Sequence, residues 1–118
     1  MRPVAPESVS ESSLRVKRKG FVMTITLNRP EALNTLNLDV VRQIRRAIDE
    51  GAAYDWVRLI LLKSTGGRAF CAGGDIKFMS QAVRDREVDR ALRFLREEYD
   101  LDLLIRGLPK PVVVVAHG

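Results

Sequence analysis

The sequence has little of several features that define well-known classes of protein. It contains one cysteine, Cys71, and one histidine, His117, among 118 residues. A single cysteine excludes an internal disulfide framework and a cysteine zinc cluster, and we expect no metal site. A histidine-based catalytic triad would have to depend on a residue next to the end of the chain, which argues against one. No apolar run approaches the roughly 20 residues of a membrane span, so we expect no contact with a membrane.

What is present indicates a folded protein. Hydrophobic residues make up 46% and charged residues 30% of the chain, which excludes a disordered tail, a collagen-like fibre and a coiled coil. The length allows one domain at most, and we expect a flexible polar tail over residues 1–13 before a domain over residues 14–118. The tail has no apolar core for a secretory signal, and its acids, Glu7 and Glu11, argue against a mitochondrial presequence. A cytoplasmic location follows by default, in agreement with the single unpaired cysteine.

The net charge of +5 raises the question of an anionic partner. The one continuous basic cluster is Arg15–Lys19, whereas residues 84–106 hold six arginines against seven acids. Charge balance says little about partners on its own, so two interpretations stay open. We favour a solvated face and expect no nucleic acid as a partner. The alternative is a non-catalytic module that binds an anion or a nucleic acid through Arg15–Lys19.

The first part of the chain reads as a hairpin followed by a helix. Residues 14–19 and 21–27 flank Gly20, and the second segment alternates between more and less apolar positions, as a strand in a hairpin does. Asn37 is expected to be the N-cap of a helix that has one apolar stripe and ends at Gly51.

The second part of the chain predicts an α/β fold. The apolar runs over residues 57–62 and 112–116 are typical of buried strands, and we expect them to be neighbouring interior strands of a parallel sheet. Between them, one helix is expected to open at Asp75 and a long helix to cover residues 84–106. The alternation of strands and helices is what indicates the α/β class.

A double glycine at the predicted start of a helix is the first candidate site. In residues 69–76 a short apolar segment is followed by Gly73 and Gly74 and then by Asp75. Glycine lets the backbone approach a ligand closely, and the first amides of a helix have no partner inside it. Together these groups would form a donor site for a developing oxyanion. On the residues alone, a plain tight turn with Asp75 as helix cap is the stronger interpretation, because glycine pairs before helices are common.

The second candidate is an acid in an apolar stripe. A period of 3.6 residues places six residues of the long helix on one face: Ala91, Phe94, Leu95, Glu98, Leu101 and Ile105. Burying the Glu98 carboxylate costs free energy unless it is paired or protonated, so Glu98 is either functional or a boundary acid paired with an arginine. Glu97 lies about 100° round the helix, near Arg90 and Arg93, in a solvated setting. We expect Cys71 to be structural and not a nucleophile, because it lies in an apolar segment with no histidine nearby.

Taken together, these motifs resemble the crotonase superfamily of acyl-CoA-processing enzymes. The stretches that carry the resemblance are, in order, Leu27–Leu36, Ala69–Ile76 and Pro109–Gly118. Within the superfamily, residues 70–76 with the later Arg-Glu-Glu-Tyr segment 96–99 are most similar to the 3-hydroxyisobutyryl-CoA hydrolases. The resemblance implies a crotonase-like fold of ββα repeats, of which this chain would be the N-terminal part. It also implies hydrolysis of an acyl-CoA thioester in valine degradation.

The resemblance implies roles for particular residues. Gly74 would supply one backbone amide of the oxyanion hole, Glu98 would contact the acyl end of the substrate, and Ala72 would line the adenine site of CoA. The other residues expected to bind substrate are Ala32, Gly73, Asp75 and Ile76. Coenzyme A would be part of the substrate, with no separate cofactor, and a homo-oligomer is compatible with the family.

Members of the family are considerably longer than this chain. The second oxyanion glycine and the acids that act on the thioester would follow residue 118, so we expect the chain alone to be inactive or nearly so. A hydratase or isomerase of the same superfamily is the alternative activity, and the later acids would decide between the two.

Overall fold

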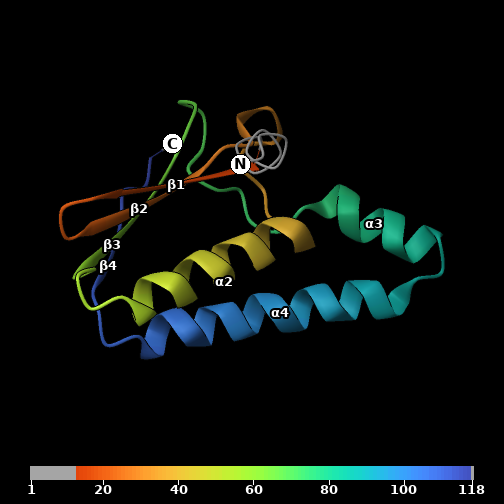
Figure 1. Ribbon diagram of the computed structural model, residues 1–118. Coiled ribbons are helices and arrows are strands. Elements are labelled where there is room, and N and C mark those ends of the chain that lie inside the picture. The colour runs from red at the N-terminus through yellow and green to blue at the C-terminus, as the bar shows by residue number, and fades with distance from the viewer. Residues whose placement is uncertain (1–12, 118) are drawn as a thin grey trace, which may run out of the picture.

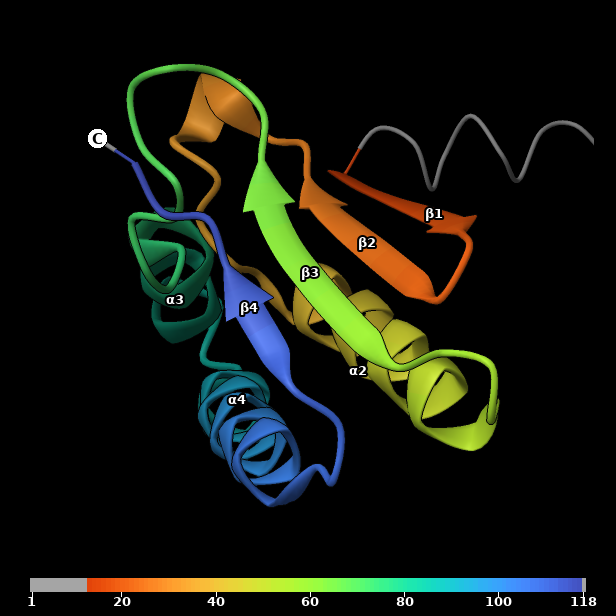
Figure 2. The ribbon, with the colours of Figure 1, turned by 90° about the vertical axis from the view of Figure 1, so that its left-hand side faces the viewer.

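A four-stranded sheet with its helices on one face forms the framework of the chain (Figures 1 and 2). The computed structural model describes residues 13–117, so the tail predicted over residues 1–13 lies outside the described residues except for its last member. The elements in chain order are β1 Leu14–Lys19, β2 Val22–Leu27, the 3-10 helix η1 Pro30–Ala32, α2 Leu38–Ala53, β3 Leu59–Ser64, α3 Ile76–Arg84, α4 Val88–Gly107 and β4 Val112–Val114.

The sheet has the strand order β1-β2-β3-β4. β1 and β2 are antiparallel, and β2 pairs with β3, and β3 with β4, in parallel. The predicted hairpin and the α/β class are therefore confirmed, and the two apolar runs do form neighbouring parallel strands. The expected interior position is wrong for β4, which is an edge strand with Val113 and Val114 45% and 48% exposed.

The bounds of β3 differ from the expected ones by two residues. The strand begins at Leu59, because the ladder with β2 begins where Leu59 pairs with Val22. It continues through Lys63 and Ser64, which pair with the last two residues of β2. Hydrogen bonding to a neighbouring strand thus sets the bounds, whereas the apolar run showed only which part of the segment could be buried.

The core lies between the sheet and α2. On β2 the side chains of Met23, Ile25 and Leu27 are buried, as the alternating pattern predicts. The stripe of α2 that faces them is also buried and consists of Val40, Val41, Ile44, Ala47 and Ile48. Asn37 caps this helix as expected, since its side-chain oxygen accepts a hydrogen bond from the Val40 N–H at 2.9 Å.

Gly51 does not end α2, contrary to expectation. The helix continues to Ala53, and Gly51 is buried in its last turn. A Cβ at this position would lie 2.9 Å from the Met23 sulfur and 3.1 Å from a terminal carbon of Ile60. Glycine is therefore required here because α2 approaches the sheet closely, and not because the backbone needs a left-handed conformation.

The side chain of Lys110, which is distant in sequence, caps the C-terminal end of α2. Lys110 Nζ donates hydrogen bonds to the carbonyl oxygens of Gly51 and Tyr54, at 2.8 and 2.6 Å. These carbonyls have no partner within the helix, and the dipole of the helix favours a cation at this end. Lys110 thereby joins the segment that leads into β4 to the end of α2.

The long helix predicted over residues 84–106 begins four residues later than expected. Arg84 is the last residue of α3, and Arg86 then adopts a left-handed conformation with φ 57°. The Glu87 N–H donates to the Ala82 carbonyl at 2.7 Å, which closes α3 with a bond that spans five residues. The chain reverses there, and α4 runs back beneath α3 and α2 (Figure 1). No helix within residues 13–117 combines the length and the apolar character needed to cross a membrane.

The two helical glycines Gly51 and Gly107 provide a matched test of this packing. Replacing glycine by alanine in a helix ordinarily stabilises a protein by about 0.5–1 kcal/mol. For Gly51→Ala we expect the opposite, a loss of about 1 kcal/mol or more, because the added methyl group meets Met23 and Ile60. Gly107→Ala should be neutral or stabilising, since nothing lies within 4 Å of the position that a Cβ would take there. Urea unfolding of both variants measures the difference, and equal effects would contradict the close approach of α2 to the sheet.

Candidate functional site

Two loops that are distant in sequence meet at the carboxyl ends of β2 and β3. The Leu36 N–H donates to the Gly73 carbonyl at 2.8 Å, and the Asp75 N–H donates to the Leu36 carbonyl at 2.7 Å. The Ala72 N–H also donates to the Leu33 carbonyl, at 3.1 Å. The loop after β2 and the loop after β3 therefore lie side by side, as Figure 2 shows. Ligand sites of α/β folds are found at this edge of the sheet.

The backbone N–H of Gly74 is left free by this pairing. On one side of it, the Gly73 carbonyl is bound to Leu36, and on the other, the Asp75 N–H is bound to the same residue. The Cys71 sulfur receives a backbone hydrogen bond from Gly73. No described residue accepts a hydrogen bond from Gly74 N–H, and Gly74 is itself partly exposed. The loop thus presents one unpaired donor at the position that the family resemblance assigns to the oxyanion.

The buried side chain of Asn34 holds the loops together. Asn34 is 2% exposed, and its oxygen accepts a hydrogen bond from the Arg29 N–H at 2.7 Å. Its nitrogen donates to the carbonyls of Thr65 and Ala69, at 2.9 and 3.1 Å. Sequence reasoning assigned no role to Asn34, because a single asparagine in a loop carries no signal of burial. Its φ of 55° lies in the left-handed region, which asparagine tolerates better than most residues.

Arg29 and Asp75 form a partly buried ion pair beside the free amide. One Arg29 nitrogen lies 3.1 Å from Asp75 Oδ2, and another donates to the Thr35 carbonyl at 2.5 Å. Asp75 also caps α3, since Oδ1 accepts from the N–H groups of Lys77 and Phe78. Desolvation raises the pKa of Asp75, but the hydrogen bond from Arg29 and those from the helix outweigh it, and the pKa lies below its usual value. The helix cap predicted at Asp75 is confirmed.

Glu98 is placed close to the site loop by α4. Phe94, one turn earlier on the same face, lies beneath Gly74, with ring carbons 3.4 and 3.5 Å from where a Cβ at that glycine would be. The Glu98 charge acts on the Cys71 thiol, whose pKa is raised mainly by burial. Burial also raises the pKa of Glu98 itself, with a further contribution from Asp102. No described arginine pairs with Glu98, so it is not the paired boundary acid of the alternative interpretation.

Glu97 lies on the solvated side of α4, as expected, and forms an exposed ion pair there with Arg42. Both of its carboxylate oxygens accept hydrogen bonds from Arg42 of α2, at 2.8 Å each. These bonds lower the pKa of Glu97. The pair joins α2 to α4, a contact that helical periodicity within α4 alone does not reveal. The expected place of Leu95 in the apolar stripe of α4 was wrong, since its side chain is 39% exposed.

The other predicted site residues are distributed around Gly74. Gly73 has φ 99°, a conformation that favours glycine, and Ala72 is exposed in the same loop. Ile76 begins α3 and is 78% exposed. Ala32 lies in η1, its carbonyl accepts a hydrogen bond from the Thr35 N–H, and the next residue, Leu33, accepts the bond from Ala72 of the site loop.

The segment after β4 reaches the same edge of the sheet. The Phe70 N–H donates to the His117 carbonyl at 3.0 Å, and the Val115 N–H donates to the Leu62 carbonyl at 2.9 Å. The His117 ring lies 3.2 Å from the Ser64 hydroxyl. β4 ends at Val114, so His117 lies beyond the strand and not at its end, and its backbone runs alongside the start of the site loop.

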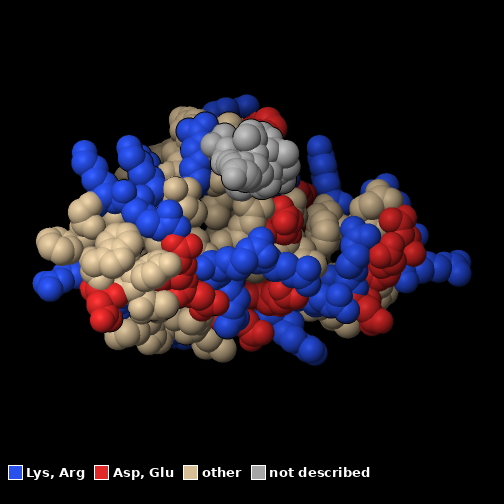
Figure 3. All heavy atoms as spheres, viewed as in Figure 1, with Lys and Arg blue, Asp and Glu red and all other residues tan. Residues whose placement is uncertain are grey.

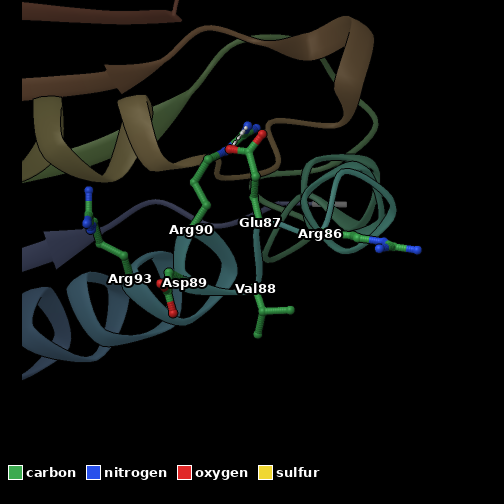
Figure 4. Close-up of a pocket in the computed structure, with 6 residues that line it drawn as sticks. All are labelled: Arg86, Glu87, Val88, Asp89, Arg90 and Arg93. Atoms are coloured by element: carbon green, nitrogen blue, oxygen red, sulfur yellow. Dashed lines mark hydrogen bonds and ion pairs between the residues drawn. The ribbon is translucent and has the colours of Figure 1, made fainter.

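An open hollow at the turn between α3 and α4 is separate from these loops. Its lining residues are Arg86, Glu87, Val88, Asp89, Arg90 and Arg93 (Figure 4). Glu87 and Arg90 pair with each other at 3.0 Å, while Arg86 points away from them (Figure 4). The charged groups do not converge on one point, and no sequence motif singled them out. Within residues 13–117 no group of three His, Cys, Asp or Glu side chains is placed to hold a metal ion.

The basic cluster of β1 does not act as one continuous surface. Arg18 forms an ion pair with Glu50 of α2, whereas its neighbours Lys17 and Lys19 are exposed. Figure 3 shows basic side chains above the hairpin and basic and acidic side chains interleaved along the helices. This arrangement favours the solvated face over an anion-binding module.

Comparison with known proteins connects these loops to a family. The family model described as enoyl-CoA hydratase/isomerase matches residues 22–118. Mitochondrial 3-hydroxyisobutyryl-CoA hydrolase of Homo sapiens is 40% identical over 103 residues, which are 87% of this chain and 26% of that protein. The Xenopus laevis enzyme of the same name is 41% identical over 113 residues, 94% of this chain and 29% of that protein. The chain thus spans between a quarter and a third of the length of the curated relatives it matches.

Solved structures show the same backbone arrangement. An enoyl-CoA hydratase from Rhodobacter sphaeroides has a TM-score of 0.82 at 33% identity and covers 91% of this chain and 32% of its own. A carnitinyl-CoA dehydratase from Mycobacterium thermoresistibile has a TM-score of 0.80 at 35% identity, over 88% of this chain and 30% of its own. The crotonase-like fold implied by the sequence resemblance is confirmed by these similarities.

The expected cytoplasmic location was wrong. The similar hydrolases from Homo sapiens, Bos taurus and Xenopus laevis are all named as mitochondrial. The expectation rested on Glu7 and Glu11, which lie outside the described residues, and on the absence of other signals. Two acids in a short segment are weak grounds for a compartment, and one free thiol is compatible with any reducing compartment.

The adjacent acids Glu97 and Glu98 should respond in opposite ways to neutralisation. Glu97→Gln removes the bidentate bond to Arg42, and we expect the free energy of unfolding to fall by up to about 1 kcal/mol at pH 7. Glu98→Gln should leave it unchanged or raise it, because the raised pKa means that burial disfavours the ionised form. The wild type should lose stability relative to Glu98→Gln as the pH rises through the pKa of Glu98. Below the usual pKa of glutamate the two should converge, as thermal melts at several pH values can show.

Proposed function

Because the chain belongs to the enoyl-CoA hydratase/isomerase family, we propose that it carries the acyl-CoA-binding loops of a CoA-thioester hydrolase. The proposed substrate is 3-hydroxyisobutyryl-CoA, after the name of the hydrolases it is similar to. The proposed role of Gly74 is to donate its N–H to the thioester carbonyl. Coenzyme A is in this proposal a part of the substrate, and no separate cofactor is required.

The observation that carries the proposal is the free N–H of Gly74. The Ala72 and Asp75 N–H groups donate to the carbonyls of Leu33 and Leu36, whereas the Gly74 N–H between them has no acceptor among the described residues. During attack on a thioester, electron density moves onto the carbonyl oxygen. A donor that is already fixed in place stabilises that oxygen more in the transition state than in the ground state, which is what accelerates the reaction.

Two further features support the binding of an acyl-CoA. Ala72 is exposed and its carbonyl accepts no hydrogen bond among the described residues, so we propose that this carbonyl accepts one from an amino group such as that of adenine. Glu98 lies near Cys71, without a partner for its carboxylate among the described residues. A carboxylate there would accept a hydrogen bond from a hydroxyl group on the acyl chain. Glu98 is therefore proposed to contact the acyl end of the substrate.

A hydratase or isomerase is the second candidate, favoured by the names of the solved structures with the same backbone. An oxyanion donor serves both reactions, because each passes through a state with negative charge on the thioester oxygen. Release of free thiol from 3-hydroxyisobutyryl-CoA, compared with addition of water to crotonyl-CoA, distinguishes the two activities.

The role of Gly74 can be tested by NMR with two matched ligands. Isobutyryl-CoA carries a thioester carbonyl, whereas coenzyme A lacks it. We expect the amide proton of Gly74 to shift downfield with isobutyryl-CoA and to stay in place with coenzyme A, because only isobutyryl-CoA carries the thioester carbonyl that would accept its hydrogen bond. Amides near Ala72 should respond to both ligands. A Gly74 resonance that responds equally to both would remove it from the oxyanion site.

The role of Glu98 can be tested by kinetics on 3-hydroxyisobutyryl-CoA with the longer protein of which this chain is proposed to be the N-terminal part, because the chain alone is expected to be inactive or nearly so. Glu98→Gln keeps the shape of the side chain and removes its charge, and we expect kcat/KM to fall at least about tenfold. The control is Asp100→Asn, an exposed acid of the same helix. Glu97→Gln is unsuitable as the control, because it also breaks the ion pair with Arg42. Equal kinetics in the Glu98 and Asp100 variants would show that Glu98 does not touch the substrate.

A further inference from the structure

Arg29 has no part in the function proposed so far, yet it contacts both loops of the site. Its guanidinium group joins the Thr35 carbonyl of the first loop to the Asp75 carboxylate of the second, at 2.5 and 3.1 Å. The side chains of Arg29 and Asp75 are only 17% and 14% exposed. A planar guanidinium with several fixed donors suits such a bridge better than a lysine, which carries its donors at one point.

The two residues that Arg29 bridges belong to, or adjoin, the hydrogen bonds on either side of Gly74. Thr35 precedes Leu36, whose N–H and carbonyl bind the residues before and after Gly74. Asp75 follows Gly74 and divides its oxygens, with Oδ2 on Arg29 and Oδ1 on the first N–H groups of α3. Arg29 therefore restrains both partners of the pairing that sets the direction of the Gly74 N–H.

Restraint of this kind matters more at Gly74 than elsewhere. Gly73 and Gly74 have no side chains to limit their backbone, and glycine has the widest range of conformations of any residue. An oxyanion donor must lie about 2.7–3.1 Å from the oxygen, and a displacement of about 1 Å in an active site can cost about a hundredfold in rate. The geometry of this loop therefore has to be imposed by its contacts.

We propose that Arg29 is a positioning residue that fixes the Gly74 N–H toward the substrate carbonyl by bridging Thr35 and Asp75. The proposal rests on the proposed function of Gly74 and adds a residue that touches neither the substrate nor the reacting atoms. The pair is ionised at neutral pH, since the pKa of Asp75 lies below its usual value. Asp75 then carries the charge that pairs with Arg29 at neutral pH.

The test uses the same two ligands, isobutyryl-CoA and coenzyme A, with variants of the bridge. Arg29→Met removes the charge and keeps an unbranched apolar side chain. Asp75→Asn breaks the ion pair but keeps an oxygen that can cap α3, so it reports on the bridge even where Arg29→Met fails to fold. Arg42→Met is the control, because it removes an ion pair between α2 and α4 without touching either loop.

In both bridge variants we expect the Gly74 shift caused by isobutyryl-CoA to fall to about half or less, with affinity for coenzyme A within about twofold of wild type. The double variant should be no worse than either single one, because the two residues act through one contact. Arg42→Met should keep the full shift even where its melting temperature falls. A full shift in Asp75→Asn would overturn the positioning role. Absence of the shift in the wild type would instead overturn the proposed function of Gly74.

Discussion

The buried side chain of Asn34 is the interaction on which the rest of the site depends. It joins the backbone of Arg29 to the carbonyls of Thr65 and Ala69, so that the loop after β2 cannot move independently of the loop after β3. A buried polar group is tolerated only when it is hydrogen-bonded, and here three bonds satisfy it. Apolar packing could bring the two loops close together, but only directional bonds can set which residue of one faces which residue of the other.

Features determined by near neighbours in sequence were predictable. The caps at Asn37 and Asp75 depend on a side chain and on amides two or three residues later, and both were identified correctly. Gly51 was misinterpreted because its reason lies in Met23 and Ile60, which reach it only through the tertiary fold. In the sequence, a glycine that ends a helix in a left-handed conformation looks the same as a glycine that makes room for a neighbouring side chain.

Glu97 and Glu98 of α4 also show the difference between features that neighbours in sequence determine and features that depend on the tertiary fold. Helical periodicity correctly separated the two faces, with Glu98 toward the apolar side. It could not show that Arg42 of α2 pairs with Glu97, because that pairing depends on how two helices cross. Nor could it show that Glu98 has no ionic partner among the described residues, which excludes the interpretation as a boundary acid paired with an arginine. Periodicity thus placed Glu98 on the apolar face, and the tertiary contacts showed which of the two acids is paired.

The free N–H of Gly74 has a fixed direction although it lies in a glycine-rich loop. Two adjacent glycines would leave a loop mobile if it had no other contacts, yet the residues on both sides of this amide are bound to Leu36. The unpaired donor is partly exposed, so water can solvate it when no ligand is bound, and its cost to folding stays small. A carbonyl oxygen that replaces that water meets a donor whose direction is already set. Under the proposed function, the hydrogen bonds made by Asn34, Leu36 and Asp75 on folding fix the direction of the Gly74 donor, so the reaction does not have to orient it.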